Sequence, residues 1–182
     1  SCCPTPVMTL PGLNDYSGQS ASYAVLDGEL DSAAEMSFVG WVRFNEWTGS
    51  YNRVFDFGNS ESAISQSMRL HRNGGSTFRM AFNDWQLIDV PNYWTLDTYI
   101  FVSVTVDADG VWTVYQDTTA LASEVVASCD DVTWSSAPNY YVAKSNWVGP
   151  EPNSNLSVYN LQWFDEKISE TCIQALFQDT PP

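Results

Sequence analysis

Aromatic residues stand beside amide, carboxylate and guanidinium side chains in the turn-rich segments of this 182-residue chain. Such a mixture is the chemistry of sugar recognition, because rings stack on the apolar faces of sugars and polar groups bond the hydroxyls. The chain has eight Trp, and most of them are also expected to pack a core. The residues that we predict to bind a ligand are Trp47, Tyr51, Asn52, Arg72, Asp84, Trp85, Trp94, Asn146 and Trp147.

The four cysteines, Cys2, Cys3, Cys129 and Cys172, favour disulfides over a zinc site. A zinc site needs closely paired ligands, and the sequence has no CxxC spacing. Adjacent cysteines rarely bond to each other, because a vicinal disulfide strains the peptide between them. We therefore predict that the first two pair with the last two, in either order. Disulfides indicate an extracellular or cell-surface compartment, and an N-glycosylation sequon at Asn155 fits the same compartment.

The charge balance is strongly acidic, with a net charge of −15 from 22 acids against 7 Lys plus Arg. Nucleic acids and anionic membranes both need a basic surface, so we expect neither as a partner. No apolar run approaches the roughly 18 residues that cross a bilayer, so no membrane insertion is expected. All five Arg lie between Arg43 and Arg79. We interpret the acids as a solvated surface that is compatible with calcium and with neutral or cationic partners.

The elements that must position these residues are organised around the stretch from Met36 to Gly58. It reads as two strands joined by a polar loop over residues 46–52. Side chains alternate across a strand, so one face of the first strand is apolar and carries Met36, Phe38, Val42 and Phe44. Trp41 falls on the opposite face, where it either packs under a neighbouring segment or lines the concave face. Two strands this apolar need a second layer to cover them.

The rest of the chain is read as further short strands, with turn signals every eight to twelve residues. The Asn-Gly-Gly at 73–75 marks a hairpin, whereas residues 84–97 read as a long aromatic loop. Only the end has helical spacing, with Ser169 as its cap. We therefore predict an all-β fold of about ten to thirteen strands: an antiparallel two-sheet β-sandwich of the jelly-roll type with one short C-terminal helix.

The predicted domain organisation has two parts. Residues 1–18 are punctuated by prolines and are expected to form an N-terminal arm with one short strand at 7–10. Residues 19–182 are expected to form a single globular domain, because this length suits one hydrophobic core.

Four segments of the sequence together resemble the laminin-G-like members of the concanavalin A-like lectin/glucanase superfamily. They are YAVLDG at 23–28, SFVGWVRF at 37–44 with RVFDFG at 53–58, FVSVTVD at 101–107 with VYQD at 114–117, and YVAKSN at 141–146 with LQWFDEKIS at 161–169. Their order and spacing match the family over roughly residues 20 to 178. The resemblance implies a concanavalin A-like jelly roll, a fold that hosts lectins, glycosidases, adhesion modules and assembly subunits.

A structural calcium ion is the one cofactor that the resemblance implies. Members of the superfamily often hold it near the first strands and by a carboxylate on the last strand, which corresponds by position to Asp27 and Asp165. The turn at residues 107–110 is a rival, although it lacks the remaining ligands of a calcium loop. Ordinary turn chemistry explains these aspartates equally well.

Catalysis has little support in the sequence. Catalytic members of the superfamily place two carboxylates about 5 Å apart on one strand, in an ExDxE or ExDxxE pattern. The nearest match is ELDSAAE at 29–35, whose last spacing is too long and which lies in a polar connection. The single histidine, His71, has no Ser-His-Asp context and is expected on the surface of a strand. We predict no catalytic residue.

The leading functional hypothesis is a non-catalytic extracellular recognition or adhesion module that binds glycans or glycoproteins. The alternative is a structural subunit of an extracellular filament or surface coat, which self-assembles through its terminal segments by adding a strand to a neighbour's sheet. A glycoside hydrolase is the third and least favoured hypothesis.

Overall fold

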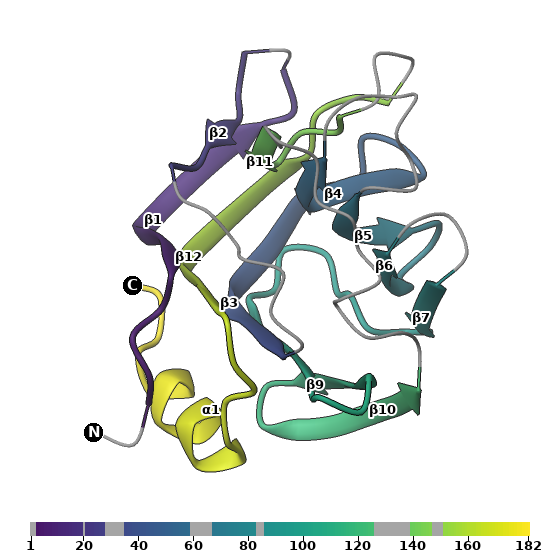
Figure 1. Cartoon of the computed structure of the whole chain (residues 1–182). Helices are drawn as coiled ribbons and strands as arrows, with labels where there is room; N and C mark the ends of the chain where they lie inside the picture. Colours follow the sequence, from purple (N-terminus) through teal and green to yellow (C-terminus); the bar gives the residue numbers. More distant parts are fainter. Residues whose placement is uncertain are drawn as a thin grey trace.

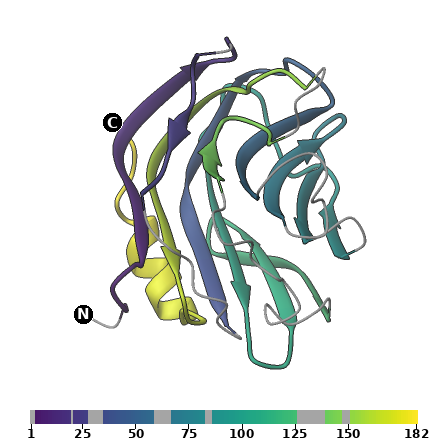
Figure 2. The same cartoon turned by 45° about the horizontal axis from the view of Figure 1, so that its top comes forward.

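The computed structural model describes residues 3–19, 21–27, 35–58, 67–82, 86–125, 139–146 and 151–182. These residues form a sandwich of two antiparallel six-stranded sheets with one short helix near the C-terminus (Figures 1 and 2). The predicted all-β, two-sheet jelly roll is confirmed.

The first sheet, which we call the β3 sheet, has the strand order β1-β12-β3-β8-β9-β10. Neighbouring strands are antiparallel throughout. In chain order its strands are β1 (Met8–Ser17), β3 (Met36–Glu46), β8 (Ile100–Val106), β9 (Val111–Gln116), β10 (Thr119–Val125) and β12 (Asn155–Phe164).

The second sheet, which we call the β4 sheet, has the order β2-β11-β4-β5-β6-β7 and is also antiparallel. Its strands are β2 (Ala24–Val25), β4 (Tyr51–Gly58), β5 (Met68–Asn73), β6 (Phe78–Phe82), β7 (Gln86–Val90) and β11 (Asn139–Val142). The stretch singled out from the sequence therefore supplies a strand at the centre of each sheet.

The core lies between the two sheets and is built from the alternation predicted for β3. The ring of Phe38 lies 4.9 Å from that of Phe55 on the facing sheet and 5.1 Å from that of Trp163. Gly40 is required in the middle of β3, because a Cβ at this position would lie 2.4 Å from the side chain of Leu161 on β12. The core thus joins the centres of both sheets through close aromatic contacts.

Strand β1 is longer than the strand predicted at residues 7–10, and it pairs with β12 within its own chain. The strand predicted from the sequence stops before Pro11, because a proline normally ends a strand. Because β1 is an edge strand with a register shift between Leu10 and Leu13, the missing N–H of this proline removes little pairing. The described part of the predicted arm therefore contributes a strand to the sandwich.

Two further elements differ from the prediction. Residues 86–90 form β7 inside the segment that was read as a loop, because Ile88 is buried in the core beside β6 and the strand ends before Pro91. The sequence predicts a strand at residues 124–127, but strand β10 begins five residues earlier, at Thr119, directly after a two-residue turn in which Asp117 adopts a φ of 55°. The β-propensity of Ile88 and Val90 was obscured by aromatic and polar neighbours, whereas β10 contains alanine and glutamate, residue types that are depleted in strands.

The outer face of the β3 sheet is covered by helix α1 (Glu170–Phe177). A second apolar cluster lies between them and includes Val39, Trp41, Phe101, Tyr115, Phe164, Ile168, Cys172 and Ile173. The Trp41 ring stacks on Phe177 at 5.2 Å, and its Nε1 donates to the carbonyl of Asp179 at 2.8 Å. Of the two alternatives for Trp41, the structure therefore shows packing under a neighbouring segment.

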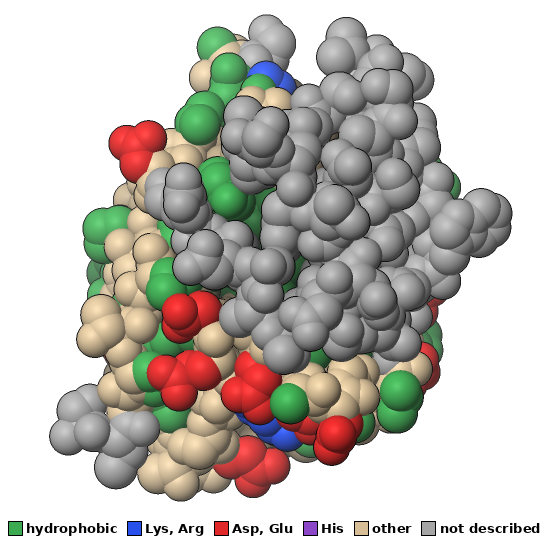
Figure 3. Space-filling view, in the orientation of Figure 1, with side chains coloured by type: hydrophobic (Ala, Val, Ile, Leu, Met, Phe, Trp, Pro, Cys, Tyr) green, Lys and Arg blue, Asp and Glu red, His purple; other side chains and the backbone are tan. Residues whose placement is uncertain are grey.

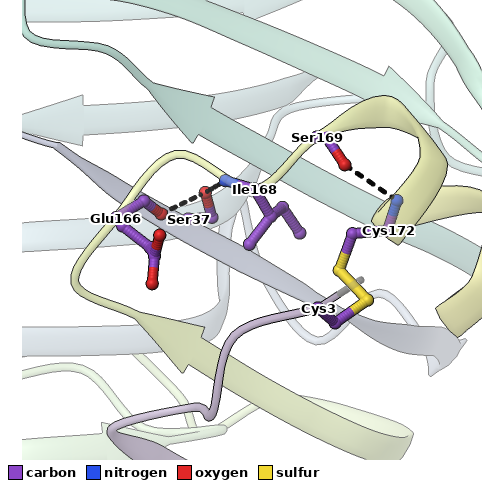
Figure 4. Close-up of a disulfide and its surroundings, with 6 residues drawn as sticks. All are labelled: Cys3, Ser37, Glu166, Ile168, Ser169 and Cys172. Atoms are coloured by element: carbon purple, nitrogen blue, oxygen red, sulfur yellow. Dashed lines mark hydrogen bonds between the residues drawn. A yellow bond between two sulfur atoms is a disulfide. The ribbon is translucent and has the colours of Figure 1, made fainter. Parts of the chain in front are cut away.

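One disulfide and three hydrogen bonds hold the helix and the turn before it in place (Figure 4). A disulfide joins Cys3 to Cys172, which agrees with the predicted pairing of the N-terminal and distant cysteines; Cys2 and Cys129 lie outside the described residues. The Ser169 hydroxyl accepts from the backbone N–H of Cys172 and so caps the helix, as predicted. The Ser37 hydroxyl on β3 donates to the carbonyl of Glu166 and accepts from the backbone N–H of Ile168, both just before the helix.

No helix in the described segments is long and apolar enough to span a membrane.

Candidate functional site

The outer face of the β4 sheet carries a cluster of basic residues. Phe55, Leu70 and Met80 pair side by side and point into the core, so the residues that alternate with them point outward. Those outward residues are Arg53 on β4, Arg69 and His71 on β5, and Arg79 on β6. We call these four residues the basic cluster. It holds three of the seven Lys plus Arg residues and the only histidine of the chain.

Arg53 is held at the buried end of this cluster by two carboxylates. Its Nε lies 3.0 Å from Asp56 Oδ2, and its Nη2 lies 2.7 Å from Glu151 Oε2. Asp56 also accepts the backbone N–H and the side-chain amide of Asn146. Asn146, which was predicted to bind a ligand, is therefore buried and orients this carboxylate.

Arg79 lies at the more exposed end of the cluster and pairs with Asp89 on β7. The two side chains make a bidentate contact, with Nε to Oδ1 at 2.7 Å and Nη2 to Oδ2 at 2.6 Å. The hydrogen bond with Asp89 raises the pKa of the Arg79 guanidinium. Both groups keep access to solvent, at 23% and 40% of their side-chain surface, so a ligand can reach them.

His71 is buried, with 3% of its surface exposed, so the prediction of a surface residue is wrong. It lies on a central strand between Arg53 and Arg79, and the Tyr51 ring packs edge-on against it at 5.9 Å. Burial and the charges of Arg53, Arg69 and Arg79 hold the pKa of His71 well below its usual value. Among the described residues its Nδ1 finds no hydrogen-bond partner, and buried polar atoms normally have one.

A second group of residues forms a rim where the loop before β4 meets the end of β5. The guanidinium of Arg72 lies 4.8 Å from the centre of the Trp47 ring. Asn52 Oδ1 accepts from Nε and Nη2 of Arg72, which also donates to the carbonyls of Gly75 and Gly49. We call Trp47, Asn52 and Arg72 the Trp47 rim. Trp47 is 40% exposed and can offer its ring to a ligand.

The structure thus brings four of the predicted ligand-binding residues together, with Tyr51 lying between the basic cluster and the Trp47 rim. Tyr51 is 45% exposed. Trp94 does not join them, because it is 3% exposed and its ring packs edge-on against Phe44 in the core. Asp84, Trp85 and Trp147 lie outside the described residues.

The metal prediction stays untested. Asp27 and Asp165 are exposed, and the described residues contain no group of three or more His, Cys, Asp or Glu side chains that could hold a metal ion. The rival aspartate, Asp107, accepts the N–H groups of Val111 and Asp109 and pairs with Lys167. These bonds lower the pKa of its carboxyl, and they are the bonds of an ordinary turn.

Two other predictions concern single side chains. Glu35, the last acid of the 29–35 segment, accepts the N–H of Ala108 at 3.3 Å, while residues 29 and 31 lie outside the described part. Asn155 lies at the start of β12 and donates to Glu46; its glycosylation stays a prediction.

Sequence reasoning missed the basic cluster, together with Asp56 and Asp89. A signal was present, because every Arg lies between residues 43 and 79, and Arg69 and His71 flank Leu70 in an alternating pattern. Basic residues at alternate positions of an apolar strand predict a charged outer face. The sequence alone did not show that three separate strands bring these residues to one place.

No protein-family model matches the chain, and no curated protein matches it. Its fold is similar to several solved structures. The CBM40 of the Ruminococcus gnavus IT-sialidase, bound to alpha2,3 sialyllactose, is 13% identical with a TM-score of 0.77 over 95% of this chain and 100% of that chain. The NanB sialidase of Streptococcus pneumoniae is 13% identical with a TM-score of 0.73, covering 94% of this chain and 28% of that chain.

The binding domain of botulinum neurotoxin serotype D is 11% identical, with a TM-score of 0.67 over 95% of this chain and 50% of that chain. The chain therefore spans just over a quarter of the NanB sialidase and the whole of the CBM40. At these identities the likeness shows the fold alone, which is a jelly-roll β-sandwich. The assignment to the concanavalin A-like superfamily, and to its laminin-G-like members, stays a prediction.

Proposed function

We propose that this chain is a non-catalytic carbohydrate-binding module whose ligand lies on the outer face of the β4 sheet, over Tyr51, Arg79 and Asp89. The observation that carries the proposal is the basic cluster, which gathers three arginines on one face of a chain with a net charge of −15. The proposal is supported by the similarity in fold to a CBM40 bound to alpha2,3 sialyllactose, because the match covers the whole length of that CBM40.

The exposed end of the cluster has the donors and acceptors that a sugar needs. A guanidinium has five N–H donors, and Asp89 uses two of those of Arg79, so about three remain for hydroxyl or carboxylate oxygens. Asp89 offers acceptors to hydroxyl groups, and the Tyr51 ring offers an apolar surface for a sugar face. The partly exposed guanidinium of Arg79 favours a sugar that carries a carboxylate, such as sialic acid, because charge-assisted bonds are the stronger ones.

The carboxylates of this face support binding rather than hydrolysis. A retaining or inverting glycosidase needs one acid and one free carboxylate across the scissile bond. Asp56 and Glu151 are both paired with Arg53, and Asp89 is paired with Arg79. We accordingly propose a module that holds a glycan without cleaving it, placed outside the cell as the disulfide suggests.

The assembly hypothesis gains no support from the described terminal segments. Strand β1 is paired with β12 of its own chain, and Asp179 accepts from Trp41 and bonds Tyr159 and Asn160. These bonds hold both terminal segments on their own domain.

A titration of sialyllactose by isothermal calorimetry tests the proposal, with lactose as the uncharged comparison. We expect sialyllactose to bind the wild-type chain and lactose to bind much more weakly. Arg79→Gln should weaken sialyllactose binding by tenfold or more, since a hydrogen bond to a charged group contributes about 1.5–3 kcal/mol.

Arg43→Gln is the matched control, because Arg43 lies on β3 and contacts Asn45, Ser157 and Tyr99 at a distance from the basic cluster. It should leave the affinity unchanged. Equal weakening by both variants, or wild-type affinities that are the same for sialyllactose and lactose, would contradict the proposed site.

A further inference from the structure

Lys144 is held between two tyrosine rings at the other edge of the β4 sheet. Its Nζ lies 4.1 Å from the centre of the Tyr23 ring and 4.3 Å from that of the Tyr141 ring. The two rings pack edge to face at 5.5 Å. Two cation–π contacts from two segments fix the position of an ammonium group that is otherwise on a flexible stem.

Lys144 has no carboxylate partner among the residues that the structure describes, although the chain has 22 acids and only two lysines. The other lysine, Lys167, behaves in the ordinary way and pairs with Asp107 at 3.0 Å. Tyrosine rings do not neutralise a positive charge. An ammonium that is fixed, partly exposed and without a carboxylate partner in the described segments is therefore suited to receive an acidic group from a ligand.

This lysine lies on the same outer face as the basic cluster. Tyr141 pairs with Val25 on one side and with Asp56 on the other, and Asp56 alternates with the core residues of β4. Val25 is 60% exposed and extends the apolar surface beside the tyrosines. In Figure 3, which shows one side of the molecule, several acidic side chains and one basic area appear in the described lower part, and a small basic area shows at the top, on the side of β2 and β11.

The strand order gives the distance between the two basic regions. From β11 to β6 the sheet runs through β4 and β5, which is three strand spacings, or about 14 Å. A single sugar is too short to bridge this distance. A chain of a few sugars is long enough, and it would pass outside the buried side chains of Arg53 and His71, which lie between the two regions.

We propose that Lys144, Tyr23 and Tyr141 form a second subsite for an acidic group, so that this chain binds glycans carrying at least two acidic groups. One acidic group lies at Arg79, and a carboxylate or sulfate several sugars away lies at Lys144. The proposal rests on the proposed function, because it places both subsites on one glycan. Preformed cation–π contacts reduce the ordering needed when the second group binds.

Calorimetry with ligands of increasing acidity tests this inference: sialyllactose with one carboxylate, α2,8-linked tetrasialic acid with four, and a sulfated chondroitin hexasaccharide. We expect tetrasialic acid to bind the wild-type chain at least tenfold more tightly than sialyllactose. Lys144→Met should remove most of that gain and leave sialyllactose unchanged. The chondroitin arm shows whether carboxylate or sulfate is the preferred group, since binding of either with the same Lys144 dependence supports the subsite.

Two further variants separate charge from packing. Lys144→Arg keeps the cation and the ring contacts and should retain the gain, whereas Lys167→Ala removes the paired lysine and should have no effect on either ligand. The melting temperature of each variant checks that the fold is intact.

The inference is overturned if tetrasialic acid binds no more tightly than sialyllactose, or if Lys144→Met weakens both ligands equally or neither. In those cases the binding of sialyllactose and its loss in Arg79→Gln would still support the proposed function. If the wild-type chain binds none of the three ligands, the proposed function fails and this inference fails with it.

Discussion

The outer faces of the two sheets have opposite chemical character among the described residues. The β3 sheet faces outward with valine, tryptophan and phenylalanine, and helix α1 covers them. The β4 sheet faces outward with arginine, histidine and aspartate on neighbouring strands. Both faces come from the same alternation in strands of one sandwich. One sheet therefore gains a second core, while the other presents paired charges that a ligand can reach at one end.

The difference shows how a sandwich separates stability from recognition. An apolar face must be covered, because exposed apolar area is unfavourable in water, and burying it contributes about 25 cal/mol per Å². A face of ion pairs contributes much less to stability where it is exposed, but its donors and acceptors stay oriented. Changes on the β3 face should therefore affect folding, and changes on the β4 face should affect binding.

The largest effect is expected from removing the disulfide that fixes α1 on the β3 face. Cys3 and Cys172 are 169 residues apart, so in the chain-entropy model the bond stabilises the fold by about 5 kcal/mol. We expect Cys3→Ala/Cys172→Ala to lower the free energy of unfolding in urea by up to that amount. Sialyllactose affinity should stay unchanged under conditions where the variant is folded.

The comparison between the faces would fail if this variant kept its stability but lost its affinity. A matched control is Ser17→Ala at the exposed end of β1, which should leave both stability and affinity unchanged. The control also checks that changes elsewhere near the N-terminus do not mimic the loss of the disulfide.

The sequence was informative about the β3 face and much less so about the β4 face, for a physical reason. Apolar alternation in β3 and helical spacing after Ser169 are local patterns, so the covered face could be predicted from nearby residues. The basic cluster comes from three strands whose members are up to 26 positions apart, from Arg53 to Arg79. Strand order and register bring them together, and neither is written in any one segment.

A smaller effect is expected from the histidine on the β4 face. His71 faces Arg53, Arg69 and Arg79 from three strands, and the Tyr51 ring covers it. Its pKa is lowered in the folded chain, so below pH 6.5 the unfolded chain binds a proton that the folded chain does not. Stability is then lost as pH falls, by about 1.4 kcal/mol at pH 5.5 relative to neutral pH.

Urea unfolding at pH 7.5 and 5.5 measures this difference. Because His71 is the only histidine, a His71→Gln variant should lose this part of the pH dependence, while the acids titrate mainly below this range. A wild-type stability that rises from pH 7.5 to 5.5 would contradict the buried, neutral histidine beside three arginines.

The smallest effect is expected at the Trp47 rim, where the sequence could not tell an exposed tryptophan from a buried one. Both Trp47 and Trp94 lie in loops rich in polar residues, and both were predicted to meet a ligand. Trp94 is enclosed by Phe44, Phe78 and Tyr93, whereas Trp47 contacts the guanidinium of Arg72. Whether a tryptophan is enclosed depends on residues of the facing sheet, and no local sequence pattern indicates which residues those are.

Trp47→Ala should therefore lower the free energy of unfolding by only about 0.5–1 kcal/mol, the magnitude of an exposed cation–π contact. Arg72 keeps its bonds to Asn52 and Gly75 in this variant, so the rim should stay in place. Urea unfolding measures the change, with Trp47→Phe as the control that keeps a ring over the guanidinium. A loss above about 2 kcal/mol would mean that Trp47 is a packing residue, and the rim would then belong with the covered face rather than with the face open to a ligand.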